Sequence, residues 1–228
     1  MPPDCWRFVA KRDGQAAILF MKTVYFMVNG IATLPGNQKN WNARAVSWIH
    51  QDKDHYRAGH RAQLDEYFTT ALTVWIHSHE RAETFAKLLN QFYGWRIIIV
   101  AHSNGCHVAL DAMRIAHSVK IHALHLVAGA VDGNFRRNGL NWMLKKGQVG
   151  DVRIYRGGRD WAMRLCCLIA GKLLFAISLR DKPLGLAGAT DVDPVVADQV
   201  MEIIEPTFGH SEWFKPENFN RTMKRFWA

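Results

Sequence analysis

The chain contains 228 residues, of which 49% are hydrophobic and 21% are charged. A chain of this length and composition can bury the core of one ordinary domain, which excludes a disordered segment, a collagen-like repeat and a small disulfide-stapled scaffold. The formal net charge is +9, but the basic residues are scattered in pairs such as Arg136-Arg137 and Lys145-Lys146, which are typical of solvated faces, so no nucleic-acid partner is expected.

The first residues are expected to form an N-terminal extension, residues 1–22, before a single domain over residues 23–228. A short apolar run at 16–21 follows the charged residues 11–13 and precedes no small-residue cleavage site, so it does not fit a secretory signal. The run is also too short to span a bilayer. Met21 is an alternative native start, which would make the preceding residues an upstream extension.

Short apolar runs alternate with amphipathic stretches along the domain. The runs predict strands at residues 23–28, 64–68, 96–101, 121–128, 152–155 and 200–204. Apolar residues at helical spacing predict helices at residues 41–50, 104–117 and 138–146, and one that ends at Tyr93. Because a continuous apolar strand suits a sheet covered on both faces, this order predicts an α/β fold with a mainly parallel central sheet flanked by helices.

Two intervals bear on whether a cap covers the sheet. Only residues 129–150 separate two neighbouring strands, and the helix predicted there leaves no room for a cap domain, so little or no cap is expected. The least regular segment, residues 161–198, is an alternative source of a lid. Its apolar tract at 162–179 contains Arg164 and Lys172, which favours a buried or amphipathic helix and no stable membrane insertion.

The stretch with the most chemical information is Ala101-His102-Ser103-Asn104-Gly105, which lies between an apolar strand and a helix. It matches the nucleophile elbow G-x-S-x-G, with Ala101 in place of the first Gly. A serine on so sharp a turn requires small residues two positions before and after it. Asn104 then offers a backbone N–H at the start of the helix, where the helix dipole favours a developing oxyanion.

From residue 23 onward the chain resembles the α/β-hydrolase superfamily of serine hydrolases, which includes esterases and lipases. The resemblance implies a triad in the chain order Ser, acid, His. Asp160, just past the strand at 152–155 and its glycines, corresponds to the acid. Asp132 is the alternative, because some family members carry the acid one strand earlier, whereas Asp191 and Asp193 are poorly placed.

The remaining family positions fall on two further loops. His210 follows the last strand and corresponds to the base, and the glycine before it, Gly209, corresponds to the one that lets the ring reach back toward the serine. The second oxyanion donor comes from the loop after the first main strand, here Asn29-Gly30-Ile31, so the N–H of Ile31 is the candidate donor. Asn29 in place of the family's His leaves the identity of that donor open. His102 and His107 flank Ser103 and are expected to be structural.

The cysteines and histidines give no sign of a metal or disulfide framework. Cys5, Cys106, Cys166 and Cys167 show no C-x-x-C spacing, and no H-E-x-x-H motif occurs. Four free thiols favour a reducing, cytoplasmic setting. Neither a metal nor a disulfide framework is therefore expected.

The sequence predicts a serine hydrolase that cleaves carboxylic esters of short to medium acyl chains. Ser103 would form the acyl-enzyme, with Asp160 and His210 as its partners and the N–H groups of Asn104 and Ile31 as the oxyanion hole. The partner would be a small-molecule acyl ester. A thioesterase, lipase or amidase with the same triad is an alternative, as is a non-catalytic binding module on the same fold.

Overall fold

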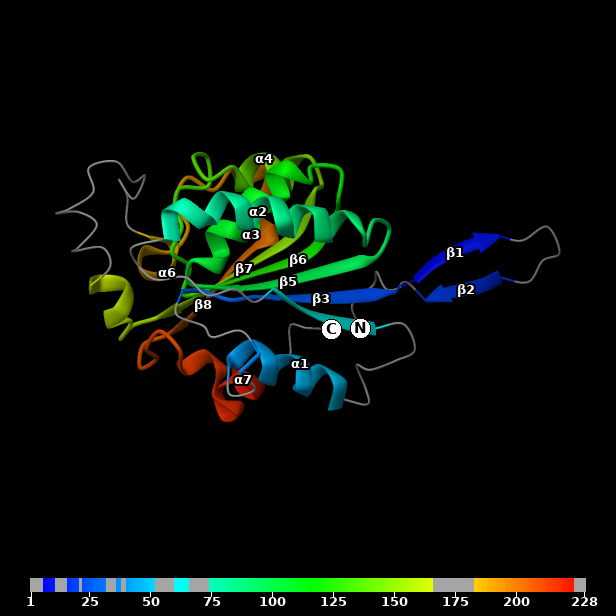
Figure 1. Cartoon of the computed structure of the whole chain (residues 1–228). Coiled ribbons are helices and arrows are strands. Elements are labelled where there is room, and N and C mark those ends of the chain that lie inside the picture. Colours follow the sequence, from blue (N-terminus) through cyan, green and yellow to red (C-terminus); the bar gives the residue numbers. More distant parts are fainter. Residues whose placement is uncertain are drawn as a thin grey trace.

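The structure is a computed structural model, which describes residues 6–10, 16–20, 22–31, 36–37, 40–51, 60–65, 74–165 and 183–223. Its centre is a six-stranded sheet with the order β4-β3-β5-β6-β7-β8, in which all paired neighbours are parallel (Figure 1). The strands are β3 (Thr23–Val28), β4 (His60–Asp65), β5 (Arg96–His102), β6 (Ile121–Val127), β7 (Val149–Gly157) and β8 (Val200–Glu205). The predicted fold class is confirmed.

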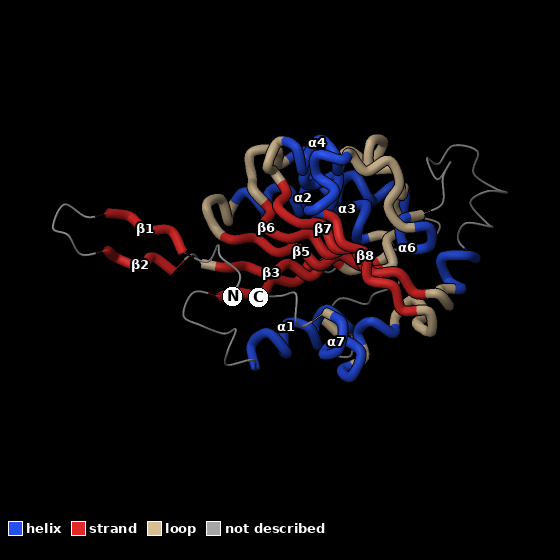
Figure 2. Tube along the Cα trace, turned by 180° about the vertical axis from the view of Figure 1, so that it is seen from behind, coloured by secondary structure: helices blue, strands red, loops and turns tan. Residues whose placement is uncertain are grey.

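Helices cover both faces of this sheet (Figure 2). One face carries α2 (Val74–Asn90), α3 (Gly105–Ile115) and α4 (Leu140–Lys145), and the other carries α1 (Trp41–Gln51) and α7 (Pro216–Thr222). The short α6 (Leu184–Ala187) and two 3₁₀ turns, η1 (Pro194–Gln199) and η2 (Glu212–Phe214), lie in the connections. The predicted N-terminal extension contains β1 (Trp6–Ala10) and β2 (Ala16–Phe20), an antiparallel pair that forms a separate sheet.

The central strands are apolar on both faces because each face packs against helices. In β3 the side chains alternate between two core clusters, with Val24, Phe26 and Val28 on one face and Tyr25 and Met27 on the other. This is why the strand reads as one continuous apolar run instead of alternating with polar residues.

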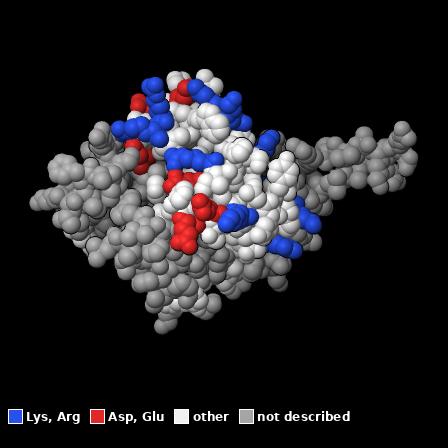
Figure 3. Space-filling model, turned by 45° about the horizontal axis from the view of Figure 1, so that its top comes forward, with Lys and Arg blue, Asp and Glu red and all other residues white. Residues whose placement is uncertain are grey.

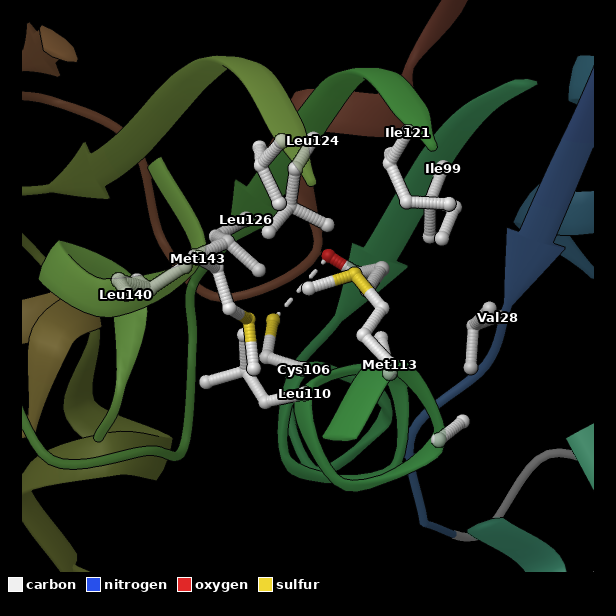
Figure 4. Packing of buried hydrophobic residues seen from close by; sticks show 14 of the residues in the cluster. Val28, Ile99, Cys106, Leu110, Met113, Ile121, Leu124, Leu126, Leu140 and Met143 are labelled. Carbon is white, nitrogen blue, oxygen red and sulfur yellow. Dashed lines mark hydrogen bonds between the residues drawn. The ribbon is translucent and has the colours of Figure 1, made fainter. Parts of the chain in front are cut away.

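The core on the α3 face also accounts for the one cysteine that the structure describes. Leu110 and Met113 of α3 pack there with Leu124 and Leu126 of β6 (Figure 4). The Cys106 thiol lies in the same cluster and donates a hydrogen bond to the carbonyl of Ala101, 3.2 Å away. Burial raises the pKa of this thiol, so it is a packing group and no nucleophile. The other three cysteines lie outside the described residues.

The strand order itself selects one edge of the sheet for a site. After β3 the chain adds β4 on one side and then β5 on the other, so the order reverses between β3 and β5. In open α/β sheets, ligands bind at the carboxyl ends of the strands beside such a reversal. The residues at that position are 29–31, after β3, and Ser103, after β5.

Several predicted boundaries differ from the observed ones. The strand predicted at residues 64–68 is β4 at His60–Asp65, and residues 66–73 lie outside the described part. The helix predicted to reach Tyr93 ends at Asn90, and β7 begins three residues before the predicted start. Most of the apolar tract at 162–179 also lies outside the described residues. Residues 129–150, which are described, contain α4 and no cap domain.

Candidate active site

Ser103 lies on a sharp turn between β5 and α3. Its φ of 54° is in the left-handed region, which a residue with a side chain rarely adopts. Its N–H donates to the carbonyl of Val127 at 2.9 Å, and its own carbonyl accepts from the N–H groups of Cys106 and Ala130. These bonds hold the turn in the strained conformation that is typical of a nucleophile elbow.

The small residues of the motif are explained by the close approach of α3 to β3. A Cβ atom added to Gly105 would lie 2.6 Å from the carbonyl oxygens of Val28 and Asn29, which leaves room for glycine alone. Ala101 is fully buried and lies opposite Val28 in the β3–β5 register. The glycine of the motif is thus required sterically, while alanine is accommodated at the other position.

The loop after β3 packs directly against the serine. A Cβ atom added to Gly30 would lie 2.8 Å from Ser103 Cβ and 3.4 Å from Ser103 Oγ. Within the described residues, the backbone N–H groups of Ile31 and Asn104 donate no hydrogen bond. Two N–H groups without an acceptor, one on each side of a serine, are what an oxyanion hole requires.

The structure brings Asp160 and His210 together although 50 residues separate them. Nδ1 of His210 lies 2.9 Å from Oδ2 and 3.1 Å from Oδ1 of Asp160, whose side chain is fully buried. Oδ1 also accepts from the N–H of Met163 at 3.0 Å, so Asp160 caps the helical turn at residues 161–165. The carboxylate is therefore fixed by the helix start and oriented toward the imidazole.

Two glycines allow the acid loop and the histidine loop to meet. A Cβ atom at Gly157 would overlap the carbonyl oxygen of Phe208, and one at Gly158 would overlap that of Pro206. By contrast, a Cβ atom at Gly209 would come no nearer than 3.7 Å to a neighbour. The glycine before the histidine, which the resemblance links to the reach of the ring, is therefore not required here by steric contact. Its steric role belongs to the pair after β7.

His102 lies beneath the candidate base and is nearly buried. Its ring centroid is 4.7 Å from that of His210, and it forms T-shaped contacts with the rings of Trp41 and Phe214. Burial, and then the proximity of His210, lower the pKa of His102 to about 3, so the ring is neutral. Its Nε2 lies 3.1 Å from the carbonyl oxygen of His210, and the bond requires that this nitrogen carry the hydrogen.

The other candidate residues are engaged elsewhere. Asp132, the alternative acid, pairs with Nε of Arg137 at 3.0 Å and accepts from the N–H of Asn134. Asp191 accepts from the side chain of Asn134, and Asp193 accepts from the N–H of Val195 and pairs with Lys145. His107 pairs with Asp111 one turn along α3. Of the four carboxylates considered, Asp160 is the one that contacts His210.

One contact of the expected triad is absent. Within the described part of the chain, Ser103 Oγ forms no hydrogen bond with His210. The two residues nevertheless follow β5 and β8, whose carboxyl ends lie at the same edge of the parallel sheet. In ligand-free enzymes, catalytic hydrogen bonds are often long and tighten when substrate binds.

A cavity of about 470 Å³ opens beside His210. Its lining comes from both loops of the acid–histidine pair: Arg159, Trp161, Ala162, Thr207, Gly209, His210, Ser211 and Glu212. Trp161 is 69% exposed, which is unusual for this residue. Glu212 accepts from the N–H of Gly209 and pairs with Lys215, and these contacts hold its pKa below the usual range. The cavity therefore offers an aromatic surface beside charged groups.

A metal-ion cluster requires several ligating side chains, and a membrane-spanning helix requires a long apolar stretch. No group of three His, Cys, Asp or Glu side chains among them could hold a metal ion. No helix among them combines the length and apolar character needed to cross a bilayer. On the face drawn in Figure 3, Lys and Arg side chains lie beside Asp and Glu side chains and form no continuous basic surface.

Sequence reasoning missed Arg81 and its contact with Asn29 next to the site. Arg81, on α2, is 5% exposed, and its Nη2 donates to Oδ1 of Asn29 at 2.6 Å. The available signal was the position of Arg81, four residues before Phe85, which places a charged residue on the apolar face of a predicted helix.

No protein-family model and no curated protein matches the sequence. Among solved structures, a hydrolase candidate from Agrobacterium vitis S4 matches with a TM-score of 0.51 and 13% identity, over 94% of this chain and 93% of that one. An uncharacterised protein from Bacillus cereus ATCC 10987 matches with a TM-score of 0.51 and 14% identity, and the match covers 94% of this chain and 59% of the Bacillus chain. At such identities the likeness shows the fold, and the chain has the α/β-hydrolase fold.

Proposed function

We propose that this protein is a serine hydrolase that cleaves carboxylic esters of short to medium acyl chains through an acyl-enzyme on Ser103. The observation that supports this most directly is the strained Ser103 turn, with a φ of 54°, at the sheet edge that also carries His210 paired with buried Asp160 at 2.9 Å. A left-handed serine after a parallel strand is costly, and such strain persists where a function uses it.

The first half of the proposed reaction transfers the acyl group to the protein. Ser103 Oγ gives its proton to Nε2 of His210 and bonds to the acyl carbon, while the carbonyl π electrons move onto oxygen. The N–H groups of Ile31 and Asn104 stabilise that oxyanion, and Asp160 accepts Nδ1–H and stabilises the imidazolium. The bond from the acyl carbon to the leaving oxygen then breaks, and His210 gives its proton to the alkoxide.

The second half returns the protein to its starting state. A water molecule gives a proton to Nε2 of His210, and its oxygen bonds to the acyl carbon. The new oxyanion collapses, the bond to Ser103 Oγ breaks, and Oγ regains the proton from His210. The products are one alcohol and one carboxylic acid, and no cofactor takes part.

A non-catalytic binding module is the second candidate, because Ser103 Oγ and His210 form no hydrogen bond within the described residues. In a hydrolase that contact forms when substrate binds, whereas a module that only binds ligand never needs it. Turnover of a simple ester therefore separates the two candidates. A Ser103→Ala variant serves as the control for turnover that does not depend on the proposed nucleophile.

The substrate proposal rests on the short interval between β6 and β7. Residues 129–150 contain α4 and no cap domain, and we propose that substrate in solution reaches Ser103 without an interface, with residues 161–198 as the alternative source of a lid. We expect hydrolysis of soluble short- and medium-chain esters, with no jump in rate as the concentration of a short triglyceride passes its solubility limit. A sharp increase at that limit, or turnover confined to long-chain emulsions, would show an interfacial lid and a lipase.

A further inference from the structure

Among the residues of α2 whose side chains the structure describes, 78–90, the buried face contains one charged residue. Its other members are small or apolar, and the set consists of Ser78, Arg81, Ala82, Phe85, Ala86 and Leu89. Arg81 is 5% exposed. A guanidinium group is rarely buried unless specific acceptors compensate for its lost hydration. The buried guanidinium of Arg81 is therefore expected to have a specific hydrogen-bond acceptor.

Arg81 binds the residue that directly follows β3. Its Nη2 donates to Oδ1 of Asn29 at 2.6 Å, across 52 residues of sequence, and the Asn29 side chain is fully buried. A hydrogen bond from a charged donor is shorter and stronger than one between neutral groups. This bond ties the loop after β3 to the helix that covers it.

The tied residue lies between the two parts of the candidate oxyanion hole. The backbone carbonyl of Asn29 lies against Gly105, at the start of α3, and the next residue, Gly30, lies against Ser103. The candidate donor, the N–H of Ile31, is two residues from Asn29. A shift of Asn29 would therefore move that N–H relative to the serine.

We propose that Arg81 is a positioning residue that acts through Asn29 to hold the Ile31 N–H where the oxyanion forms. This inference rests on the proposed serine-hydrolase function. Donors stabilise a transition state only when they are held in place before the reaction, so loosening the tie lowers kcat and leaves ground-state binding nearly intact. Asn29, where family members often carry His, is thereby assigned a role as the acceptor for Arg81.

The test compares Arg81→Lys, Arg81→Met and Asn29→Ala with the unaltered protein on one soluble ester. Each change is expected to lower kcat by about 10- to 100-fold, with KM changed less than about threefold, because removal of an oxyanion donor outright costs roughly 100- to 1,000-fold. Lysine keeps the charge but lacks the planar fork, so it should not restore the rate. Affinity for a boronic acid that mimics the tetrahedral intermediate should fall in parallel with kcat/KM.

The double variant Arg81→Met/Asn29→Ala supplies the decisive comparison. If the two side chains act as one unit, it loses no more activity than either single variant. The matched control is Arg96→Met, which removes an arginine that bonds His122 at 2.7 Å at the opposite end of the sheet. It should lower the melting temperature without changing kcat.

Three outcomes would overturn the proposal: kcat within threefold of the unaltered protein in Asn29→Ala and in whichever Arg81 variant folds, additive losses in the double variant, or boronic acid affinity that does not follow kcat/KM. Failure of the proposed function looks different. In that case the unaltered protein is inactive, or Ser103→Ala is as active as the unaltered protein, and both proposals fall together.

Discussion

The nucleophile corner, residues 28–31 and 101–105, lies at the ends of the paired strands β3 and β5. The acid–histidine corner, residues 156–163 and 206–214, lies at the ends of the paired strands β7 and β8, and aromatic side chains pack against it as well. In the nucleophile corner, β3 and β5 pair directly, and backbone hydrogen bonds and close glycine contacts set the geometry. Two short stretches of sequence therefore specify most of that corner.

The acid–histidine corner depends on aromatic packing from distant parts of the chain. Trp41 of α1 stacks on Phe214 with ring centroids 4.0 Å apart, and Trp213 packs edge-on against Tyr155 and Phe208. His102 connects the two corners, because it precedes the nucleophile and donates to the carbonyl of His210. Backbone and glycine contacts hold both corners, and the acid–histidine corner depends in addition on aromatic side chains of α1 and η2.

The largest effect on kcat is expected from removing the hydroxyl group of Ser103 in the nucleophile corner. Ser103→Ala should lower kcat by up to about a million-fold, because the reaction then lacks its nucleophile. The fold should survive, since the change deletes one oxygen and leaves the backbone bonds of the turn in place. Kinetics together with a thermal melt check both statements. Hydrolysis near the original rate would remove Ser103 from the mechanism.

The second effect separates the acids of the two corners. Asp160→Asn should lower kcat by about ten-thousand-fold, because an amide cannot stabilise the imidazolium of His210. Asp132→Asn is the matched control, and its effect should be much smaller because that carboxylate pairs with Arg137. The reverse ranking would mean that the acid lies one strand earlier. Full activity in both variants would undermine the triad.

The third effect tests how the acid–histidine corner is assembled. Gly158→Ala should lower kcat by about 10- to 100-fold, because the added methyl overlaps the backbone at Pro206 and displaces the histidine loop. Gly209→Ala should be nearly neutral, since its nearest neighbour would be 3.7 Å away. If the variant at 209 is the more damaging one, the glycine beside the histidine sets the geometry after all.

The smallest effect concerns stability and the buried histidines beneath this corner. Burial, followed by the charge of Arg153, lowers the pKa of His125 to about 3, and His102 is similarly low. The unfolded chain binds protons below pH 6.5 and the folded chain does not, so stability falls as the pH decreases. Each histidine should cost about 2 kcal/mol between pH 8 and pH 5.

Denaturant unfolding at both pH values measures this loss. His125→Phe keeps a flat ring against Tyr155 but cannot titrate, so its free energy of unfolding should depend less on pH than that of the unaltered protein. An unchanged pH dependence in this variant would show that His125 is protonated in the folded state or exposed to water.

The sequence predicted what depends on local chemistry. The strand at 23–28 matches β3 over all of its residues, and the small residues around Ser103 identified the elbow before its geometry was known. The pairing of Asp160 with His210 followed from a family pattern, since nothing in the spacing of 50 residues indicates a contact.

What the sequence missed depends on tertiary contacts. Gly157 and Gly158 must be glycine because the backbone of the histidine loop passes close to them. Arg81 has its proposed role because it donates a hydrogen bond to Asn29. Neither neighbour is close in sequence, so the helical periodicity could place Arg81 on an apolar face but could not show which residue it binds.

The central claim, that Ser103 is a nucleophile activated by His210, is tested most directly by covalent labelling with a fluorophosphonate. The protein is treated with the probe and digested, and the modified peptide is identified by mass spectrometry. The account predicts one phosphonylated residue, Ser103, with labelling abolished in Ser103→Ala and strongly slowed in Asp160→Asn. An unlabelled protein, or a label on a different residue that persists in Ser103→Ala, would contradict the account.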